Sequence, residues 1–246
     1  MKALNKYKQL NPETDTLPLL VFDIETVRSH SVLPESGPVF EAWKYKRRKE
    51  NEVDYQSLSL SFNTMAPLYA AFTQVIAASF GYYKANKVYI KSFYGADEKL
   101  LLEEIAAFIN DKKVAKQFIP SGYSIKGYDL PVLSKKYLSH GLPIPDRIDF
   151  SGLKPWEADS LDLMELIKFG GFYPDNLLET CLLLGVEGSK CDNIDGSQVS
   201  DIYYGAGKDK AKLATISSYC NEDVFSTLNC FLKVLGWNAA DSYEVR

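Results

Sequence analysis

The chain has 246 residues, 46% of them hydrophobic and 13% aromatic, which is enough apolar material for one large globular core. Its formal net charge of −4 excludes a basic protein that coats nucleic acid through lysine and arginine, but not an enzyme whose acids are offset by metal ions. No apolar run approaches the ~20 residues of a membrane-spanning helix, and no signal-peptide core follows the N-terminus, so we expect a cytoplasmic protein without a membrane partner.

The first clear strand pattern covers residues 19–26, where apolar residues occupy both faces until two acids interrupt them. Asp23 and Glu25 are two positions apart and therefore share one face of this strand. Two carboxylates at the end of a buried strand are costly to desolvate unless a positive charge lies between them, and a divalent cation is the usual solution. The alternative is that both acids leave the sheet for solvent. Matching acids later in the chain decide between the two.

Between residues 27 and 72 the pattern loosens, and we interpret this stretch as a long insertion. Within it, residues 40–50 contain no helix breaker and combine basic with aromatic side chains, which predicts a helix. Such a helix could contact a phosphate backbone and offer Trp43 or Tyr45 for base stacking. The alternative, which we favour, is an ordinary solvated helix with Phe40 and Trp43 packed underneath.

The middle of the chain predicts a mixed sheet. Residues 74–83 and 87–94 are β-rich runs joined by a short turn, which is typical of a hairpin. Residues 98–110 repeat apolar side chains at helical spacing after Asp97, a good helix cap. A further strand is expected over residues 117–123. Antiparallel strands, a crossover helix and another strand together describe an α/β fold.

Further acids follow in the second half of the chain. Asp129 lies in a small loop just before an expected helix, where a lone aspartate is usually a cap. The last long helix is expected over about residues 209–236 and carries Tyr219 and Asp223 four positions apart, hence on one face. The alternative for this helix is that it exposes an acid while Tyr219 packs.

The remaining segments predict short elements. Residues 159–167 begin as a strand or cap and become helical, and short helices are expected over 176–185 and 198–204, with the polar loop 188–197 between them. The cysteines are widely spaced, which favours reduced thiols, mainly in the core, over a zinc knuckle or a disulfide framework. They are Cys181, Cys191, Cys220 and Cys230.

Taken together, three motifs in order resemble the DEDD exonuclease superfamily: FDIET at 22–26, GYD at 127–129 and YCNED at 219–223. The tyrosine four positions before the last aspartate is similar to the DEDDy branch. The chain looks most similar to the predicted 3′-5′ exonucleases related to the proofreading domain of family-B DNA polymerases. The resemblance spans about residues 18–237, and the segments 162–166 and 195–199 are also similar to that family.

The resemblance implies a ribonuclease-H-like fold, in which a mixed β-sheet is flanked by helices and four acids gather at one edge. They are expected to hold two divalent cations, Mg²⁺ or Mn²⁺, since carboxylate oxygens are the ligands. Matched motif to motif, Asp23 would bridge both ions, and Glu25 with Asp223 would hold the ion that generates hydroxide. Asp129 would hold the second ion, largely through water. Tyr219 would orient the attacking water as a hydrogen-bonding group more than as a base.

Substrate contacts are expected from Thr26, Ser124 and Tyr128, which lie within or beside the motifs. Relatives often carry Asn where this chain has Ser124, whose shorter side chain has less reach to the terminal nucleotide. We expect a single domain over residues 1–246, with its core at about 18–237 and the insertion at about 27–72.

The implied activity is 3′-5′ exonucleolytic hydrolysis of single-stranded nucleic acid, with DNA favoured over RNA and nucleoside monophosphates as products. One alternative is an exonuclease for RNA or short oligonucleotides, because sensing of the 2′-hydroxyl depends on pocket shape. The other is a binding module that keeps the fold without turnover and grips single strands through the basic insertion. A binding protein has no need to bury four carboxylates together, which favours the enzyme. A protein partner remains open.

Overall fold

The computed structural model describes residues 2–50, 54–154, 156–188, 196, 198–205 and 210–246, with only the backbone described at 115–117 and 210–211. In this part of the chain, one mixed sheet has the strand order β5-β4-β1-β2-β3-β6. The strands are β1 Leu19–Arg28, β2 Thr73–Lys84, β3 Lys87–Tyr94, β4 Ile119–Gly122, β5 Leu161–Asp162 and β6 Tyr243–Val245. β1, β2 and β3 are antiparallel, while β4 runs parallel to β1 and ends early along it. The sheet confirms the mixed topology expected from the sequence.

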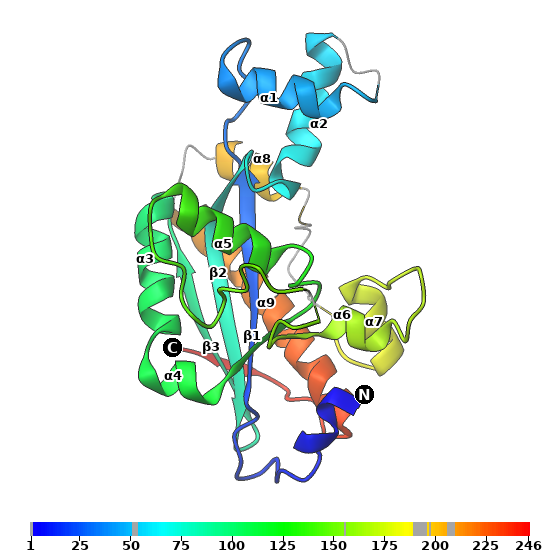
Figure 1. The fold of residues 1–246 in the computed structure, drawn as a ribbon. Helices are drawn as coiled ribbons and strands as arrows, with labels where there is room; N and C mark the ends of the chain where they lie inside the picture. The colour runs from blue at the N-terminus through cyan, green and yellow to red at the C-terminus, as the bar shows by residue number, and fades with distance from the viewer. Residues whose placement is uncertain (1, 51–53, 155, 189–195, 197, 206–209) are drawn as a thin grey trace.

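Helices cover both faces of the sheet (Figure 1). The long helix α9, Lys210–Leu235, crosses one face against β1, β2 and β3. The other face packs against α3, Glu98–Ile109, and α5, Asp129–Ser139. The remaining helices are η1 Lys2–Tyr7, α1 Pro38–Arg47, α2 Tyr55–Met65, η2 Ala66–Leu68, α4 Lys112–Gln117, α6 Leu163–Ile167, α7 Leu177–Leu184 and α8 Val199–Gly205.

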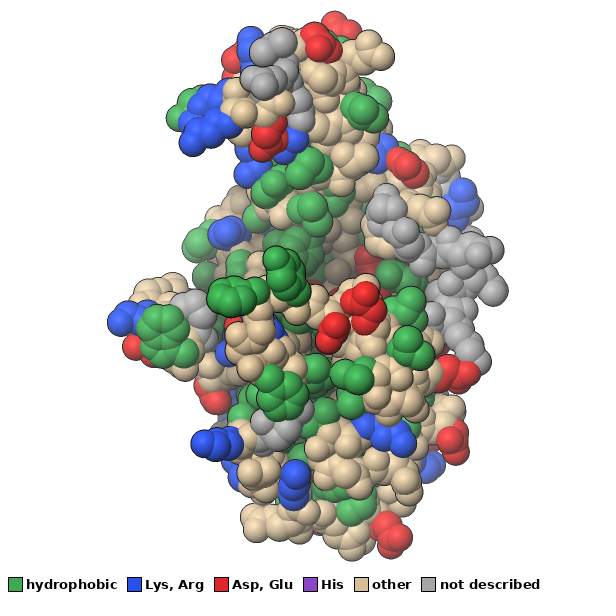
Figure 2. All heavy atoms as spheres, turned by 90° about the vertical axis from the view of Figure 1, so that its right-hand side faces the viewer, with side chains coloured by type: hydrophobic (Ala, Val, Ile, Leu, Met, Phe, Trp, Pro, Cys, Tyr) green, Lys and Arg blue, Asp and Glu red, His purple; other side chains and the backbone are tan. Residues whose placement is uncertain are grey.

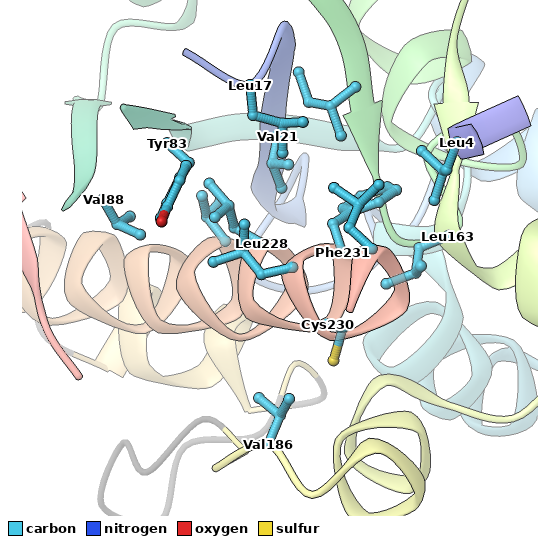
Figure 3. Packing of buried hydrophobic residues seen from close by; sticks show 14 of the residues in the cluster. Leu4, Leu17, Val21, Tyr83, Val88, Leu163, Val186, Leu228, Cys230 and Phe231 are labelled. Atoms are coloured by element: carbon cyan, nitrogen blue, oxygen red, sulfur yellow. The ribbon is translucent and has the colours of Figure 1, made fainter. Parts of the chain in front are cut away.

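Side-chain alternation along β1 assigns its two faces to two cores. Leu19 and Val21 belong to the cluster beneath α9, which Figure 3 shows around Leu228 and Phe231. Leu20, Phe22 and Ile24 point the other way and pack into the cluster under α3 and α5. Alternate residues of a strand share a face. Asp23 and Glu25 are the next alternate positions after Leu19 and Val21, so their side chains also turn toward α9.

The insertion between β1 and β2 forms a small helical lobe of α1, α2 and η2, which projects beyond the end of the sheet (Figure 1). We call it the α1–α2 lobe. It has its own hydrophobic cluster centred on Trp43, which is 0% exposed. The Trp43 indole N–H donates to the carbonyl of Leu58 at 3.0 Å and to the Ser61 hydroxyl at 3.2 Å. Trp43 is therefore a core residue rather than a stacking platform, as the favoured interpretation of the basic helix expected.

Several elements differ from the sequence-based expectation. The short helix α4 occupies residues just before β4, because the Asp111 side chain caps it by accepting from the Lys113 N–H at 2.8 Å. α2 lies in a serine-rich stretch that has no strong helix signal, and β6 adds an edge strand at the C-terminus. Of the expected polar loop 188–197, most residues lie outside the described part of the chain, and so does Cys191.

Among the described residues, no helix has both the length and the apolar character that a membrane crossing requires.

Candidate active site

Asp23 lies in the middle of β1 and Glu25 in its second half, both on the face that turns toward α9. Ligand oxygens of these two acids and the sulfur of Cys220 on α9 all lie within 4.8 Å of one another. Glu25 is 7% exposed, and within the described residues no hydrogen bond contributes to the pKa of its carboxyl. The register between β1 and β2 shifts directly after Glu25, a local irregularity of the kind that often re-aims side chains beside active sites.

Asp129 approaches Asp23 and Glu25 from the side of β1 on which β4 lies. β4 pairs with β1 only as far as Val21, so the edge of β1 beyond that point is open. The Asp129 carboxylate fills this edge by accepting a hydrogen bond from the Ile24 N–H at 3.1 Å. A close turn makes this possible: a Cβ on Gly122 would lie 2.7 Å from the Phe22 carbonyl and 2.3 Å from the Ile125 side chain. Glycine at this position lets the chain leave β4 and return to β1.

Tyr219 and Asp223 come from α9, whose position over the sheet is fixed by Asn221 between them. The Asn221 side-chain oxygen accepts from the Ser79 hydroxyl at 2.7 Å and from the Ser92 hydroxyl at 2.6 Å. Asn221 is buried at 6% exposure, so this polar junction holds the YCNED turn of α9 against β2 and β3. As a result, the third motif faces the strand that carries the first.

The electrostatics show that the four carboxylates converge. Burial raises the pKa of Asp23 well above its usual range, and the charges of the three other acids raise it further. The pKa of Glu25 rises for the same reasons, burial first and then Asp223. Burial raises the pKa of Asp129 to about 7 despite the hydrogen bond from Ile24. Like charges held close together in a largely buried site disfavour ionisation of one another, which is the pattern at many catalytic centres.

Tyr219 lies against the same acids. Burial raises the pKa of its hydroxyl above the ordinary value, and the charges of Asp223 and Glu25 raise it further. A hydrogen bond between the Tyr219 hydroxyl and Asp223 acts in the same direction. The hydroxyl therefore stays protonated near neutral pH and can donate or accept a hydrogen bond, but it cannot act as a general base there.

A divalent cation fits this donor set. Carboxylate oxygens are the ligands that Mg²⁺ and Mn²⁺ prefer, and a positive ion would relieve the mutual repulsion that raises the pKa of each acid. Cys220 is the unexpected neighbour. Its Sγ lies 3.3 Å from the Asp23 carbonyl oxygen and 3.4 Å from Asp23 Oδ2.

Thr26 and Tyr128, which were expected to touch substrate, also touch each other. Their hydroxyl oxygens lie 2.6 Å apart, and the Tyr128 hydroxyl donates to the Pro67 carbonyl at 2.7 Å. Pro67 belongs to η2, so these hydroxyls join the α1–α2 lobe to the strand and loop that carry the acids. Contact of either residue with a nucleotide stays a prediction.

Ser124 has a left-handed backbone, with φ at 59°, and its loop is organised by Asp162. Asp162 Oδ1 accepts from the backbone N–H of Ser124 at 2.9 Å and of Met164 at 3.1 Å, while Oδ2 accepts from the Lys126 N–H at 3.0 Å. Asp162 therefore fixes the loop that leads to Asp129. It lies in a segment that resembles the exonuclease family, but no role followed from its sequence context. Cys220 and Asn221 were likewise missed, although both lie inside the third motif.

The two histidines, His30 and His140, match no motif, and the structure keeps His140 away from the acids. Its Nε2 lies 2.8 Å from Glu98 Oε2 at the start of α3. Glu98 also bonds the Val75 N–H at 2.6 Å, so this cluster ties α5 and α3 to β2 rather than serving chemistry.

Comparison with solved structures finds a similar fold in a family B DNA polymerase from the hyperthermophilic archaeon Pyrobaculum calidifontis. The TM-score is 0.52 at 19% sequence identity over 88% of this chain. The match covers 24% of the polymerase chain, so this protein spans about a quarter of that enzyme's length. The likeness shows that this chain shares an α/β fold of the ribonuclease-H-like kind with part of that polymerase.

None of the curated proteins compared with the chain matches it. A comparison with protein families, in contrast, matches residues 67–240, a stretch that includes Asp129, Tyr219 and Asp223 and begins after the strand with Asp23 and Glu25. Because this stretch is well over half of the sequence, the chain belongs to the family described as predicted 3′-5′ exonucleases related to the exonuclease domain of PolB.

Proposed function

We propose that the chain is a metal-dependent exonuclease that hydrolyses single-stranded nucleic acid from its 3′ end, prefers DNA and releases nucleoside monophosphates. The observation that carries this proposal is the convergence of four acids from three separate segments, β1, the start of α5 and α9. Gathering like charges in a buried site costs free energy, and binding of divalent cations offsets that cost. Membership of the exonuclease family supports the same conclusion.

Asp23, Glu25, Asp129 and Asp223 would hold two divalent cations, Mg²⁺ or Mn²⁺. When bound, such ions activate a water and stabilise the charge that develops on the phosphate and the leaving oxygen. The protein's own part is to keep the acids in place: Asp129 through the Ile24 N–H, and α9 through Asn221.

Tyr219 would orient the attacking water. Its hydroxyl is protonated near neutral pH, so it can hold the water by a hydrogen bond. The proton that the water loses would pass to one of the acids. This assigns Tyr219 a positioning role at the reacting atoms rather than the role of a base.

The single-stranded nucleic acid would enter the site beneath the α1–α2 lobe. On the face shown in Figure 2, the surface is hollowed below the lobe and hydrophobic side chains line the hollow. Apolar walls suit unstacked bases, which supports a single-stranded substrate. The tie between Tyr128 and Pro67 places the base of the lobe beside the acids. A cytoplasmic location stays a prediction.

The test is a time course on 5′-labelled and 3′-labelled single strands, with Mn²⁺, Mg²⁺ or EDTA. A 3′-5′ exonuclease shortens the 5′-labelled strand in single steps and releases labelled mononucleotide from the 3′-labelled strand at once. Comparing the rates on DNA strands and on RNA strands of the same sequence shows whether the enzyme prefers deoxyribose or ribose. Asp23→Asn keeps the size of the side chain and removes its charge, so it should stop hydrolysis without unfolding the protein.

Full activity in EDTA, or a ladder that shortens from the 5′ end, would contradict the proposal. Tight binding of single strands without any product in Mn²⁺ would favour the binding module instead.

A further inference from the structure

We propose that Cys220 is a metal ligand, which gives the acidic site a second mode of binding in which a thiophilic divalent ion such as Zn²⁺ is held by Cys220 Sγ, Asp23 and Glu25. This inference deepens the proposed function, since it concerns the same site. It goes beyond it because the proposed hydrolysis uses only oxygen ligands and assigns no role to sulfur.

The spacing of the donor atoms carries the proposal. Cys220 Sγ lies 3.4 Å from Asp23 Oδ2, and both lie within 4.8 Å of a Glu25 oxygen. In tetrahedral zinc sites, Zn–S is about 2.3 Å and Zn–O about 2.1 Å, which separates sulfur from oxygen by roughly 3.6 Å. The sulfur and the Asp23 oxygen are already close to that separation, so small side-chain rotations would complete the set.

Glu25 provides a second, independent observation. Its residue is more than nine-tenths buried, and burial and the charges of Asp223 and Asp129 raise the pKa of its carboxyl with no hydrogen bond to oppose them. A buried carboxylate without a partner is costly, and it is aimed at the other two donor atoms. An ion placed among the three would satisfy it.

The two modes of binding differ in which ions they favour. Hard ions such as Mg²⁺ gain little from sulfur, so with them Cys220 stays a thiol that donates to Asp23. A thiophilic ion instead forms a bond to Sγ: the S–H bond breaks, the proton passes to solvent water, and the thiolate remains on the metal. Cys220 is 0% exposed, so the ion must arrive past Asp23, which is only partly buried. The two kinds of ion then compete for Asp23 and Glu25.

The experiment uses Co²⁺ as a spectroscopic probe of the full-length protein, with a phosphine reductant and without Mg²⁺ or Mn²⁺. A cobalt–thiolate bond produces a charge-transfer band in the near ultraviolet. We expect the band in the wild type and its loss in Cys220→Ser, whose hydroxyl can still donate to Asp23. Added Zn²⁺ should remove the band by displacement.

Cys230→Ser is the matched control. Cys230 lies on the same helix and is also buried, but Figure 3 shows it pointing toward Val186, away from the sheet, and its Sγ lies 3.6 Å from that of Cys181. The band should survive this substitution. A band that persists in Cys220→Ser, or that disappears in Cys230→Ser instead, would overturn the proposal, as would the absence of any band in the wild type.

Affinity gives a second readout. Cys220→Ser should weaken Zn²⁺ binding, measured by displacement of a chromophoric chelator, by on the order of 10–100-fold or more. Substitution of a residue that only hydrogen-bonds a metal ligand already lowers metal affinity by about that factor. Binding of Mn²⁺ should change far less. Equal losses for both ions would show that Cys220 only positions Asp23, and would overturn the thiolate bond.

These measurements stand apart from the nuclease assay. If the cobalt band depends on Cys220 but no strand is hydrolysed in Mn²⁺, the proposed function fails and the thiolate ligand stands. If hydrolysis occurs in Mn²⁺ and no thiolate band forms, the proposed function stands and the thiolate ligand fails.

Discussion

The Asp129 carboxylate accepts a hydrogen bond from the backbone N–H of Ile24, at 3.1 Å and across 105 residues of sequence. Ile24 stands between Asp23 and Glu25, so this contact fixes Asp129 beside both. β4 ends too early to pair with this part of β1, so the Asp129 carboxylate, rather than a neighbouring strand, bonds the Ile24 N–H. The sheet edge itself therefore becomes part of the site.

The first prediction concerns stability and pH in the absence of divalent ions. Burial raises the pKa of Asp129 in the folded state to about 7, above its unfolded value, and the pKa values of Asp23 and Glu25 are raised as well. A raised carboxyl pKa favours the folded state only while the group is protonated. In EDTA, the contribution of these acids to the free energy of unfolding should therefore be highest below about pH 4, where they are protonated in both states, and the Asp129 contribution should fall as pH rises from about 4 to 7.

Thermal melts in EDTA across this range would measure the loss, which should be on the order of a few kcal/mol. Millimolar Mn²⁺ should raise the melting temperature most at pH 8, because it binds only the folded, ionised site. Asp129→Asn should flatten the slope in EDTA. A slope that is the same in the variant and the wild type would show that Asp129 is already ionised in the folded protein at low pH.

The second prediction concerns Tyr219. Tyr219→Phe removes the hydroxyl that orients water but no metal ligand, so kcat should fall by roughly 10–10³-fold while binding of Mn²⁺ is unchanged. Burial and the neighbouring acids raise the Tyr219 pKa, so its ionisation should be absent from the rate profile between pH 6 and 9. The measurement is the pH dependence of kcat for the wild type and the variant.

An unchanged kcat would remove Tyr219 from the mechanism. A basic limb in the wild-type profile that vanishes in Tyr219→Phe would instead show that its hydroxyl ionises during turnover.

Local patterns predicted the sheet and the face on which each motif residue lies, whereas the gathering of the motif residues was implied by the resemblance to the exonuclease family. Alternation along a strand puts Asp23 and Glu25 on one face, and helical spacing does the same for Tyr219 and Asp223. The structure brings these faces together, as the order of the motifs implied.

Contacts between distant segments could not be read in the same way. Asn221 bonds serines from two different strands, and Asp162 bonds a loop 36 to 38 residues earlier, so neither role has a local signature. α2 was missed because serine and asparagine have weak intrinsic helix propensity, and its formation depends on packing Leu58 and Phe62 against Trp43.

The third prediction tests Asp162, which is 2% exposed and accepts from three backbone N–H groups. Asp162→Ala leaves those donors unsatisfied, so the free energy of unfolding should fall by about 2–4 kcal/mol. Activity should fall further than stability alone explains, because the loop that leads to Asp129 loosens. Denaturant unfolding and kcat at a temperature where the variant is folded would measure the two effects. Asp159→Ala, an exposed acid in the same region, is the control and should change neither.

The last prediction concerns the basic side chains of α1. Arg47 is 8% exposed and pairs with Glu50, so it serves the lobe itself rather than a ligand. Lys44, Lys46 and Arg48 are exposed, and Figure 2 shows Lys and Arg side chains gathered on the lobe above the hollow. The hydrogen bond from Tyr128 to Pro67 joins the lobe to the residue that precedes Asp129, so a long nucleic-acid strand that enters the site would pass these cations.

Replacing Lys44, Lys46 and Arg48 together with Ala should raise KM for long single strands several-fold and flatten its dependence on salt, because fewer counterions are released. Hydrolysis of a short p-nitrophenyl phosphodiester, which cannot reach the lobe, should be unchanged. Lys99→Ala, Lys112→Ala and Lys113→Ala combined remove the same charge from α3 and α4 and should leave KM as it was. Equal rises in KM for both triple variants would assign the effect to net charge, and no rise in either would return α1 to an ordinary solvated helix face.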